Sequence, residues 1–254
     1  MPVVHCICGQ QLERQSNDEL LASLRSHIAD AHADWGDVVE PELLEVISRA
    51  SEMEPWDGRP RPLPGPIEIR PLEESRLADY QQFFDRTAFM DNTMWAGCYC
   101  HFYCFPGTKE QWQRRRSAEN REAQSELIGL GRVQGYLAYA AGKVVGWCNA
   151  APRSLLPGLD REDELRIDDA EAIGSIVCFV VAAPYRGQGV AKQLLEAACQ
   201  GLRAQALTIA EAYPRSDEVS SSAAYHGPLT MYLAAGFEPY REAGTWTIVR
   251  KRLA

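Results

Sequence analysis

Three features are scarce or missing in this sequence of 254 residues. No apolar run approaches the ~20 residues that cross a bilayer, and the N-terminus lacks the basic and then apolar pattern of a secretory signal. The first 66 residues contain no Lys, and five Arg stand there against 12 Asp and Glu, in a chain with a net charge of −9. Such an acidic segment repels nucleic-acid phosphates. We expect a soluble, cytoplasmic protein with neither a membrane nor a nucleic acid as partner.

Two common phosphate-binding motifs are also missing. The sequence contains no Walker loop and no Lys-Ser or Lys-Thr pair. Gly187 and Gly189 do not make a good dinucleotide fingerprint, because Lys192 stands where a third small residue belongs. The glycines nevertheless lie between an apolar run at 175–182 and a helical pattern at 191–202. A tight turn that opens a helix leaves unpaired N–H groups at the positive end of the helix dipole, so the sequence predicts an anion site here.

A proline-rich segment divides the chain. Residues 59–66 read Arg-Pro-Arg-Pro-Leu-Pro-Gly-Pro, and alternating prolines favour an extended linker over a helix or a central strand. We therefore predict an N-terminal helical module at 1–58 and a larger domain at 67–254. In the module, Ser16 and Glu19 fit a capping box, and a second helix is expected near Pro41. The first helix should bury one side, made of Leu20, Leu21, Leu24, Ile28 and Ala31.

Cysteine and histidine in the module have the spacing of a metal site. The chain has eight Cys and no secretory pattern, which favours reduced thiols or metal ligation over disulfides. Cys6 and Cys8 precede the first helix, and His27 and His32 lie late on it, as in a small zinc finger. The cysteine spacing is one residue shorter than usual. We predict a structural zinc held by these four side chains, which would stabilise a unit too small for a large core.

The larger domain alternates strand and helix patterns. An Ala141-Gly142 turn is expected to join two strands in a hairpin. Antiparallel strands followed by a strand-helix-strand unit favour an α/β fold with a mixed sheet. The expected strands are 67–71, 136–139, 144–151, 175–182, 206–212 and 245–250, and the expected helices are 76–88, 109–130, 191–202 and 228–235.

The domain resembles the GNAT N-acetyltransferase superfamily from about residue 67 to 254. Arg186, Gly189 and Ala191 match its pyrophosphate loop, and residues 231–237 resemble its Leu-Tyr-x-x-x-Gly-Phe segment. Tyr225 departs from the family, since many members have Asn there. The resemblance implies a mostly antiparallel GNAT-type sheet flanked by helices, with acetyl-CoA as co-substrate. It implies cofactor contacts from Phe179, Val180, Val181, Arg186, Gly187, Gln188, Gly189, Val190, Ala191 and Lys192.

The same resemblance suggests catalytic roles. The Val181 N–H would stabilise the charge that develops on the acyl oxygen, and Tyr232 would protonate the leaving thiolate. Glu211 ends the strand opposite the cofactor strand and is our candidate for the general base, with His226 and Asp91 as weaker ones. Packing for Tyr232 and substrate orientation for Glu211 are the competing interpretations.

The segment Cys98-Tyr99-Cys100-His101-Phe102-Tyr103-Cys104 leaves three interpretations open. It could bind zinc, but seven residues are few for four ligands. One Cys could accept the acyl group covalently if a neighbour lowered its pKa. We favour the third, in which this aromatic-rich loop lines the acceptor pocket.

The sequence therefore predicts an enzyme that moves an acetyl group from acetyl-CoA to an amine, in a direct attack within a ternary complex. The overall acidity favours a small cationic amine as acceptor. The alternative is a binding protein that senses acyl-CoA and whose zinc module recruits a protein partner. A protein partner or a homodimer stays open in either case.

Overall fold

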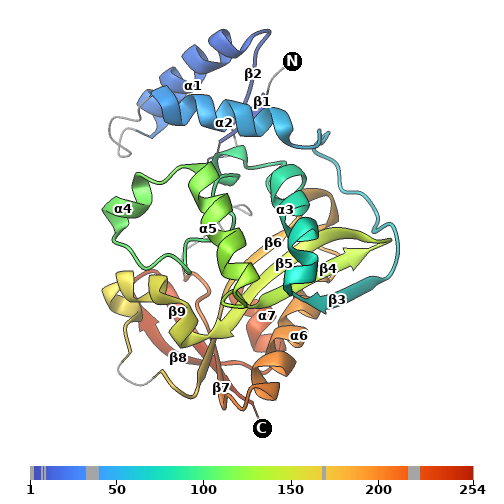
Figure 1. The fold of residues 1–254 in the computed structure, drawn as a ribbon, viewed down its shortest axis with the longest axis vertical. Helices are drawn as coiled ribbons and strands as arrows, with labels where there is room; N and C mark the ends of the chain where they lie inside the picture. The colour runs from blue at the N-terminus through green and yellow to red at the C-terminus, as the bar shows by residue number, and fades with distance from the viewer. Residues whose placement is uncertain are drawn as a thin grey trace.

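The computed structural model describes residues 3–6, 8, 10–32, 40–167, 170–216 and 224–253. Its centre is a seven-stranded sheet in the order β3-β4-β5-β6-β7-β9-β8 (Figure 1). Only the β6–β7 pair is parallel, so the predicted mixed, mostly antiparallel sheet is confirmed. The strands are β3 (Ile67–Pro71), β4 (Gly135–Ala140), β5 (Lys143–Pro152), β6 (Ile173–Val181), β7 (Ile209–Ala212), β8 (Glu238–Ala243) and β9 (Trp246–Arg252).

Local sequence explains most of these strands. Ala141 and Gly142 both have positive φ, at 49° and 76°, which suits the two-residue turn that joins β4 to β5. Strand β7 starts later than we expected, because Ala206 takes a left-handed φ of 61° in a turn at residues 205–206, and two further residues precede the strand. Strand β8 was not predicted.

Helices cover both faces of the sheet. Neighbouring residues of β5 pack into opposite layers: Trp147 lies with aromatic residues of α3, and Cys148 lies with Leu194 of α6. A central strand that is buried on both faces reads as a continuous apolar run. The helices of this domain are α3 (Leu77–Arg86), α4 (Lys109–Gln113), α5 (Ser117–Gly129), α6 (Val190–Ala204) and α7 (Leu229–Ala234). Short 3₁₀ turns are η2 (Glu74–Arg76), η3 (Thr93–Trp95), η4 (Arg153–Leu155), η5 (Pro157–Arg161), η6 (Asp163–Leu165) and η7 (Ala183–Tyr185).

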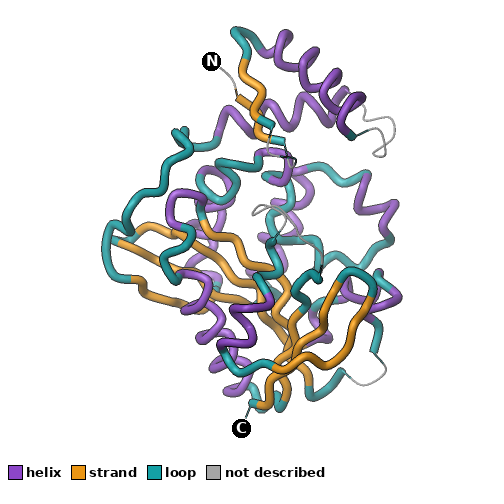
Figure 2. Tube along the Cα trace, turned by 180° about the vertical axis from the view of Figure 1, so that it is seen from behind, coloured by secondary structure: helices purple, strands orange, loops and turns teal. Residues whose placement is uncertain are grey.

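The N-terminal residues form a hairpin and two helices with a core of their own. The elements are β1 (Val3–His5), β2 (Gln11–Glu13), α1 (Asn17–Ala31) and α2 (Glu40–Glu52). Ser16 caps α1 by accepting from the Glu19 N–H at 3.2 Å, as predicted. The expected apolar side of α1 is buried except for Ala31, which is exposed. Figures 1 and 2 place this unit at one end of the molecule and the C-terminus at the other.

Within the described part of the chain, no helix combines the length and the apolar composition of a bilayer crossing.

Candidate active site and candidate metal centre

The glycine turn forms one wall of a groove beside β6. Gly187 and Gly189 have φ values of 73° and 82°, and Gly189 is the N-cap of α6. The first N–H groups of a helix have no internal partner, and the first residues of α6 line the groove, so their N–H groups are available there as anion donors. The groove is a cavity of about 400 Å³. Of the ten residues predicted to bind the cofactor, it is lined by Phe179, Val180, Val181, Arg186, Gly187, Gly189, Val190, Ala191 and Lys192.

Gln188 is the predicted cofactor residue that does not line this groove. Its side chain binds the proline-rich linker instead: Oε1 accepts from the Leu63 N–H at 3.0 Å, and Nε2 donates to the Arg61 carbonyl at 2.8 Å. These two bonds tie the linker to the glycine turn. The role of the Gln188 side chain is therefore to position the loop.

Arg186 braces the loop in a similar way. Its Nε donates to the Val181 carbonyl at 3.0 Å, and its guanidinium makes a two-pronged ion pair with Asp91, one prong being Nη2 to Oδ1 at 3.0 Å. These contacts favour a role for Arg186 in fixing the loop. The same ion pair occupies Asp91, which was a weaker candidate for the base.

The Val181 N–H points into the groove. The β6–β7 pairing ends at Ile176 and Ala212, so the two strands separate beyond that point. The Phe179 N–H crosses the gap to the Tyr225 carbonyl at 2.6 Å, whereas the Ala182 N–H points the other way, to β5. N–H directions alternate along a strand, so the Val181 N–H lies on the same side as that of Phe179. A backbone donor is thus aimed at the gap between the strands.

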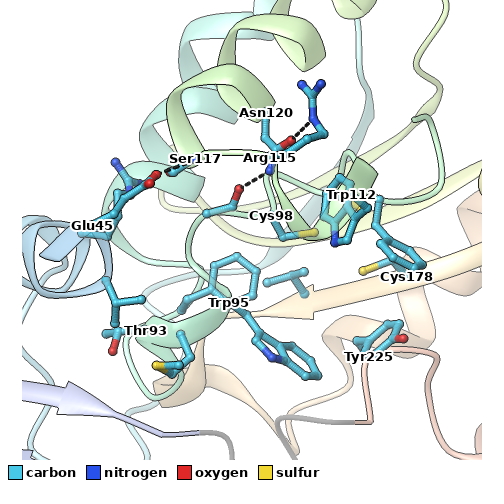
Figure 3. Close-up of a pocket in the computed structure, with 18 of the residues that line it drawn as sticks. Glu45, Thr93, Trp95, Cys98, Trp112, Arg115, Ser117, Asn120, Cys178 and Tyr225 are labelled. Carbon is cyan, nitrogen blue, oxygen red and sulfur yellow. Dashed lines mark hydrogen bonds between the residues drawn. The ribbon is translucent and has the colours of Figure 1, made fainter. Parts of the chain in front are cut away.

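A second cavity, of about 410 Å³, adjoins the groove. Val180, Tyr225, Trp95 and Phe89 line both, so they form the shared wall of the two cavities. Among the residues that line this cavity, Figure 3 shows Trp95 and Cys98 near the centre of the view, with Tyr225 and Cys178 on one side and Glu45 and Thr93 on the other. The cysteine-rich loop contributes Cys98, Cys100, Phe102 and Tyr103 to the lining.

The thiols of this loop differ in acidity. Burial raises the pKa of Cys98 and of Cys104 to about 12. Burial alone would also raise the pKa of Cys100, but this pKa is lowered, because the neighbouring side chains of Cys178, Trp147 and Asn149 favour the thiolate. The Asn149 amide donates to this sulfur at 3.4 Å. Cys100 is consequently the loop thiol with the most thiolate character.

Buried titratable groups lie at and behind the shared wall. Tyr103 lines the same cavity as Tyr225, and its hydroxyl lies 3.0 Å from Nε2 of His226. Burial, followed by the charge of Arg215, lowers the pKa of His226 to about 3, and burial raises that of Tyr225 to about 12. At neutral pH the imidazole is therefore uncharged and the phenol keeps its proton.

Neither predicted catalytic side chain lines these two cavities among the described residues. Tyr232 is fully buried and donates its hydroxyl to the His226 carbonyl at 2.6 Å; burial raises its pKa well above the ordinary value. Glu211 is 1% exposed, and both of its carboxylate oxygens are engaged. Oε2 pairs with Arg250 at 2.7 Å, and Oε1 accepts from the Tyr213 hydroxyl at 2.7 Å. Their catalytic roles stay predictions.

The four predicted zinc ligands lie together. One ligand atom from each of Cys6, Cys8, His27 and His32 falls within 4.8 Å of the others. Cys6 Sγ is 3.1 Å from His32 Nε2, and Cys8 Sγ is 3.4 Å from His27 Nε2. Zn–S and Zn–N bonds in a tetrahedron put ligand atoms roughly 3.5 Å apart. The donor set therefore fits zinc in both chemistry and spacing.

Strands β6 and β7 separate beside a helix, α6, that begins with a glycine turn, and two adjoining cavities open there. This architecture is that of an acyltransferase fold. The chain belongs to the acetyltransferase (GNAT) family, whose sequence profile matches residues 95–226. No curated protein matches it significantly.

Similar solved structures include three acetyltransferases at low sequence identity. PaiA N-acetyltransferase from Thermoplasma acidophilum, in complex with coenzyme A, is 15% identical over 74% of this chain and 99% of that chain, with a TM-score of 0.45. An N-acetyltransferase from Staphylococcus aureus is 13% identical over 75% and 100%, with a TM-score of 0.46. YncA from Salmonella typhimurium, a putative acetyltransferase with acetyl-CoA, is 13% identical over 74% and 94%, with a TM-score of 0.42.

Proposed function

We propose that this protein is an acetyl-CoA-dependent N-acetyltransferase that acts on a small-molecule amine by direct attack in a ternary complex. The observation that carries the proposal is the pair of cavities with a shared wall at Val180 and Tyr225. One cavity ends at the glycine turn and suits a phosphate-bearing donor, and the other offers an aromatic lining to an acceptor. A protein that only senses acyl-CoA has no need of the second cavity.

The groove residues would bind and orient the donor. The N–H groups at the start of α6 and the Lys192 ammonium would hold the phosphates. Acetyl-CoA, when bound, supplies an activated acetyl thioester. The Val181 N–H would donate to the acyl oxygen, where negative charge develops during the attack, and one well-placed donor of this kind is worth about 3 kcal/mol.

The shared wall would handle protons. A protonated Tyr225 can donate its proton to the departing thiolate and regain one from the attacking nitrogen, so that the proton lost by the amine ends on CoA. This arrangement needs no carboxylate at the shared wall of the two cavities. The sequence-based hypothesis gives the acid role to Tyr232 and the base role to Glu211, so the two schemes make different predictions.

We further propose that the four-ligand cluster binds one structural zinc. Four protein ligands leave zinc no open position for water or substrate, which is the arrangement of structural sites. When bound, the metal would link the β1–β2 hairpin to the end of α1. Its binding energy would then stabilise the small N-terminal core.

Steady release of CoA in the presence of an amine panel tests the proposed activity. The enzyme hypothesis predicts amine-dependent turnover and an N-acetylated product. Binding of acetyl-CoA without turnover by any amine of the panel would favour the sensor instead. Calorimetry with acetyl-CoA alone does not separate the two, because both bind it.

A further inference from the structure

One wall of the second cavity comes from the N-terminal module. Glu45, Val46 and Arg49 of α2 line it, while Leu43 and Ile47 of the same helix pack in the module's core, against which Val46 also rests. At about 3.6 residues per turn, Glu45 and Arg49 fall on a different face of α2 from Leu43 and Ile47, and Val46 lies at the border between the two faces. The helix is therefore shared between the module's core and the cavity.

The module also holds the segment that carries Trp95. The His5 N–H donates to Thr93 Oγ1 at 3.0 Å, and Met94 packs against the core of the module. Trp95, the next residue, lines both cavities. The whole η3 turn is thus anchored in the module on one side and forms part of the shared wall on the other.

Contacts with the larger domain fix α2 in this position. Glu45 accepts a hydrogen bond from the backbone N–H of Ser117 at the start of α5. The Arg49 guanidinium contacts Asp85 of α3 at 3.4 Å and lies 5.2 Å from the centroid of the Tyr99 ring. The wall made by α2 is therefore held by charged contacts as well as by packing.

The lining of the cavity indicates the kind of acceptor. The rings of Trp95, Phe102, Tyr103, Trp112 and Tyr225 surround it. The charged groups of its lining already have partners within the protein: Arg115 with Asn120, Arg49 with Asp85, and Glu45 with the Ser117 N–H. An aromatic enclosure binds apolar rings by stacking and attracts an ammonium group through its ring faces. An amine carried on an aromatic body matches this chemistry.

We infer that the N-terminal module is a specificity element of the acceptor site, where α2 and the shared wall together select an amine on a ring-sized apolar body. Val46 limits how long that body can be. This inference rests on the proposed function, since it assigns the acceptor of the same reaction.

Two substitutions at one position test the inference by binding alone. Calorimetry would measure propylamine, phenethylamine and 4-phenylbutylamine against protein saturated with CoA. Val46→Trp fills the cavity and should weaken phenethylamine binding about tenfold or more, with propylamine little changed. Val46→Ala enlarges it and should shift the preference toward 4-phenylbutylamine. Loss of stability in the module would weaken binding in both variants, so opposite shifts report the cavity itself.

Leu44→Trp is the matched control, because Leu44 lies on the same helix and is 45% exposed. It should bind all three amines as the parent does. If both Val46 variants also bind them as the parent does, α2 is no wall of the site. A parent that binds CoA but none of the arylalkylamines would overturn the acceptor class, whereas a parent that does not bind CoA would overturn the proposed function itself.

Discussion

At the scale of single residues, the scheme based on the structure and the one based on the sequence differ most in which tyrosine donates the proton. Tyr225 lines both cavities. The Tyr232 hydroxyl, in contrast, donates its hydrogen bond to the His226 carbonyl and lines neither cavity. We expect Tyr225→Phe to lower kcat about 10²-fold and Tyr232→Phe to lower it much less, with acetyl-CoA binding kept in both. Steady-state kinetics of the two variants decides. A larger loss in Tyr232→Phe would favour the sequence-based hypothesis.

Glu211 gives a second test at this scale. Its carboxylate is buried between Arg250 and Tyr213, and removing one partner of a buried ion pair costs about 3–5 kcal/mol. Glu211→Gln keeps the shape but loses the charge, so we expect a large drop in the free energy of unfolding, measured by urea denaturation. At a low temperature where the Glu211→Gln variant is folded, it should retain most of the parent's kcat. Parental stability with abolished kcat would assign the base role to Glu211.

At the scale of elements, the glycine turn before α6 should be essential for the donor. Gly189→Glu puts a side chain at a φ of 82° and a negative charge at the phosphate site, so acetyl-CoA affinity should fall at least ~100-fold. Gly142→Glu is the matched control: it adds the same charge at a φ of 76° in the exposed β4–β5 turn. Calorimetry should show that the Gly142→Glu variant binds acetyl-CoA as the parent does. Micromolar binding by a folded Gly189→Glu protein would refute the assignment.

Elements whose structure depends on a few adjacent residues could be predicted from the sequence. The glycine turn, the hairpin at Ala141 and the capped α1 all follow from a few adjacent residues. Strand β8 was missed because it lies at the edge of the sheet and is mostly exposed and polar, so no apolar alternation marks it.

The surroundings of the site residues could not be predicted in the same way. The Arg250 partner of Glu211 is 39 residues further along, and Asp91 reaches Arg186 across 95 residues. Such pairings depend on the tertiary fold and leave no spacing pattern in the chain. For the same reason the contribution of α2 to the second cavity was missed, although the helix itself was expected.

At the scale of the whole molecule, loss of the metal should affect amine binding in the second cavity but not acetyl-CoA binding in the groove. We expect about one zinc per chain by elemental analysis, lost in a Cys6→Ser/Cys8→Ser double variant and kept in a Cys199→Ser control. Chelation should unfold α1, seen as lost helical circular dichroism, and should weaken amine binding. Acetyl-CoA should still bind, because the glycine turn that would hold its phosphates lies in the other domain. Undiminished zinc in the double variant would refute the ligand set.

The most direct test of direct transfer between the two cavities is the initial-rate pattern with acetyl-CoA and phenethylamine, combined with mass spectrometry of product and protein. A ternary complex predicts intersecting double-reciprocal lines, N-acetylphenethylamine as the product and an unmodified enzyme. Parallel lines, together with an acetyl group on Cys100 that passes to the amine, would contradict direct attack.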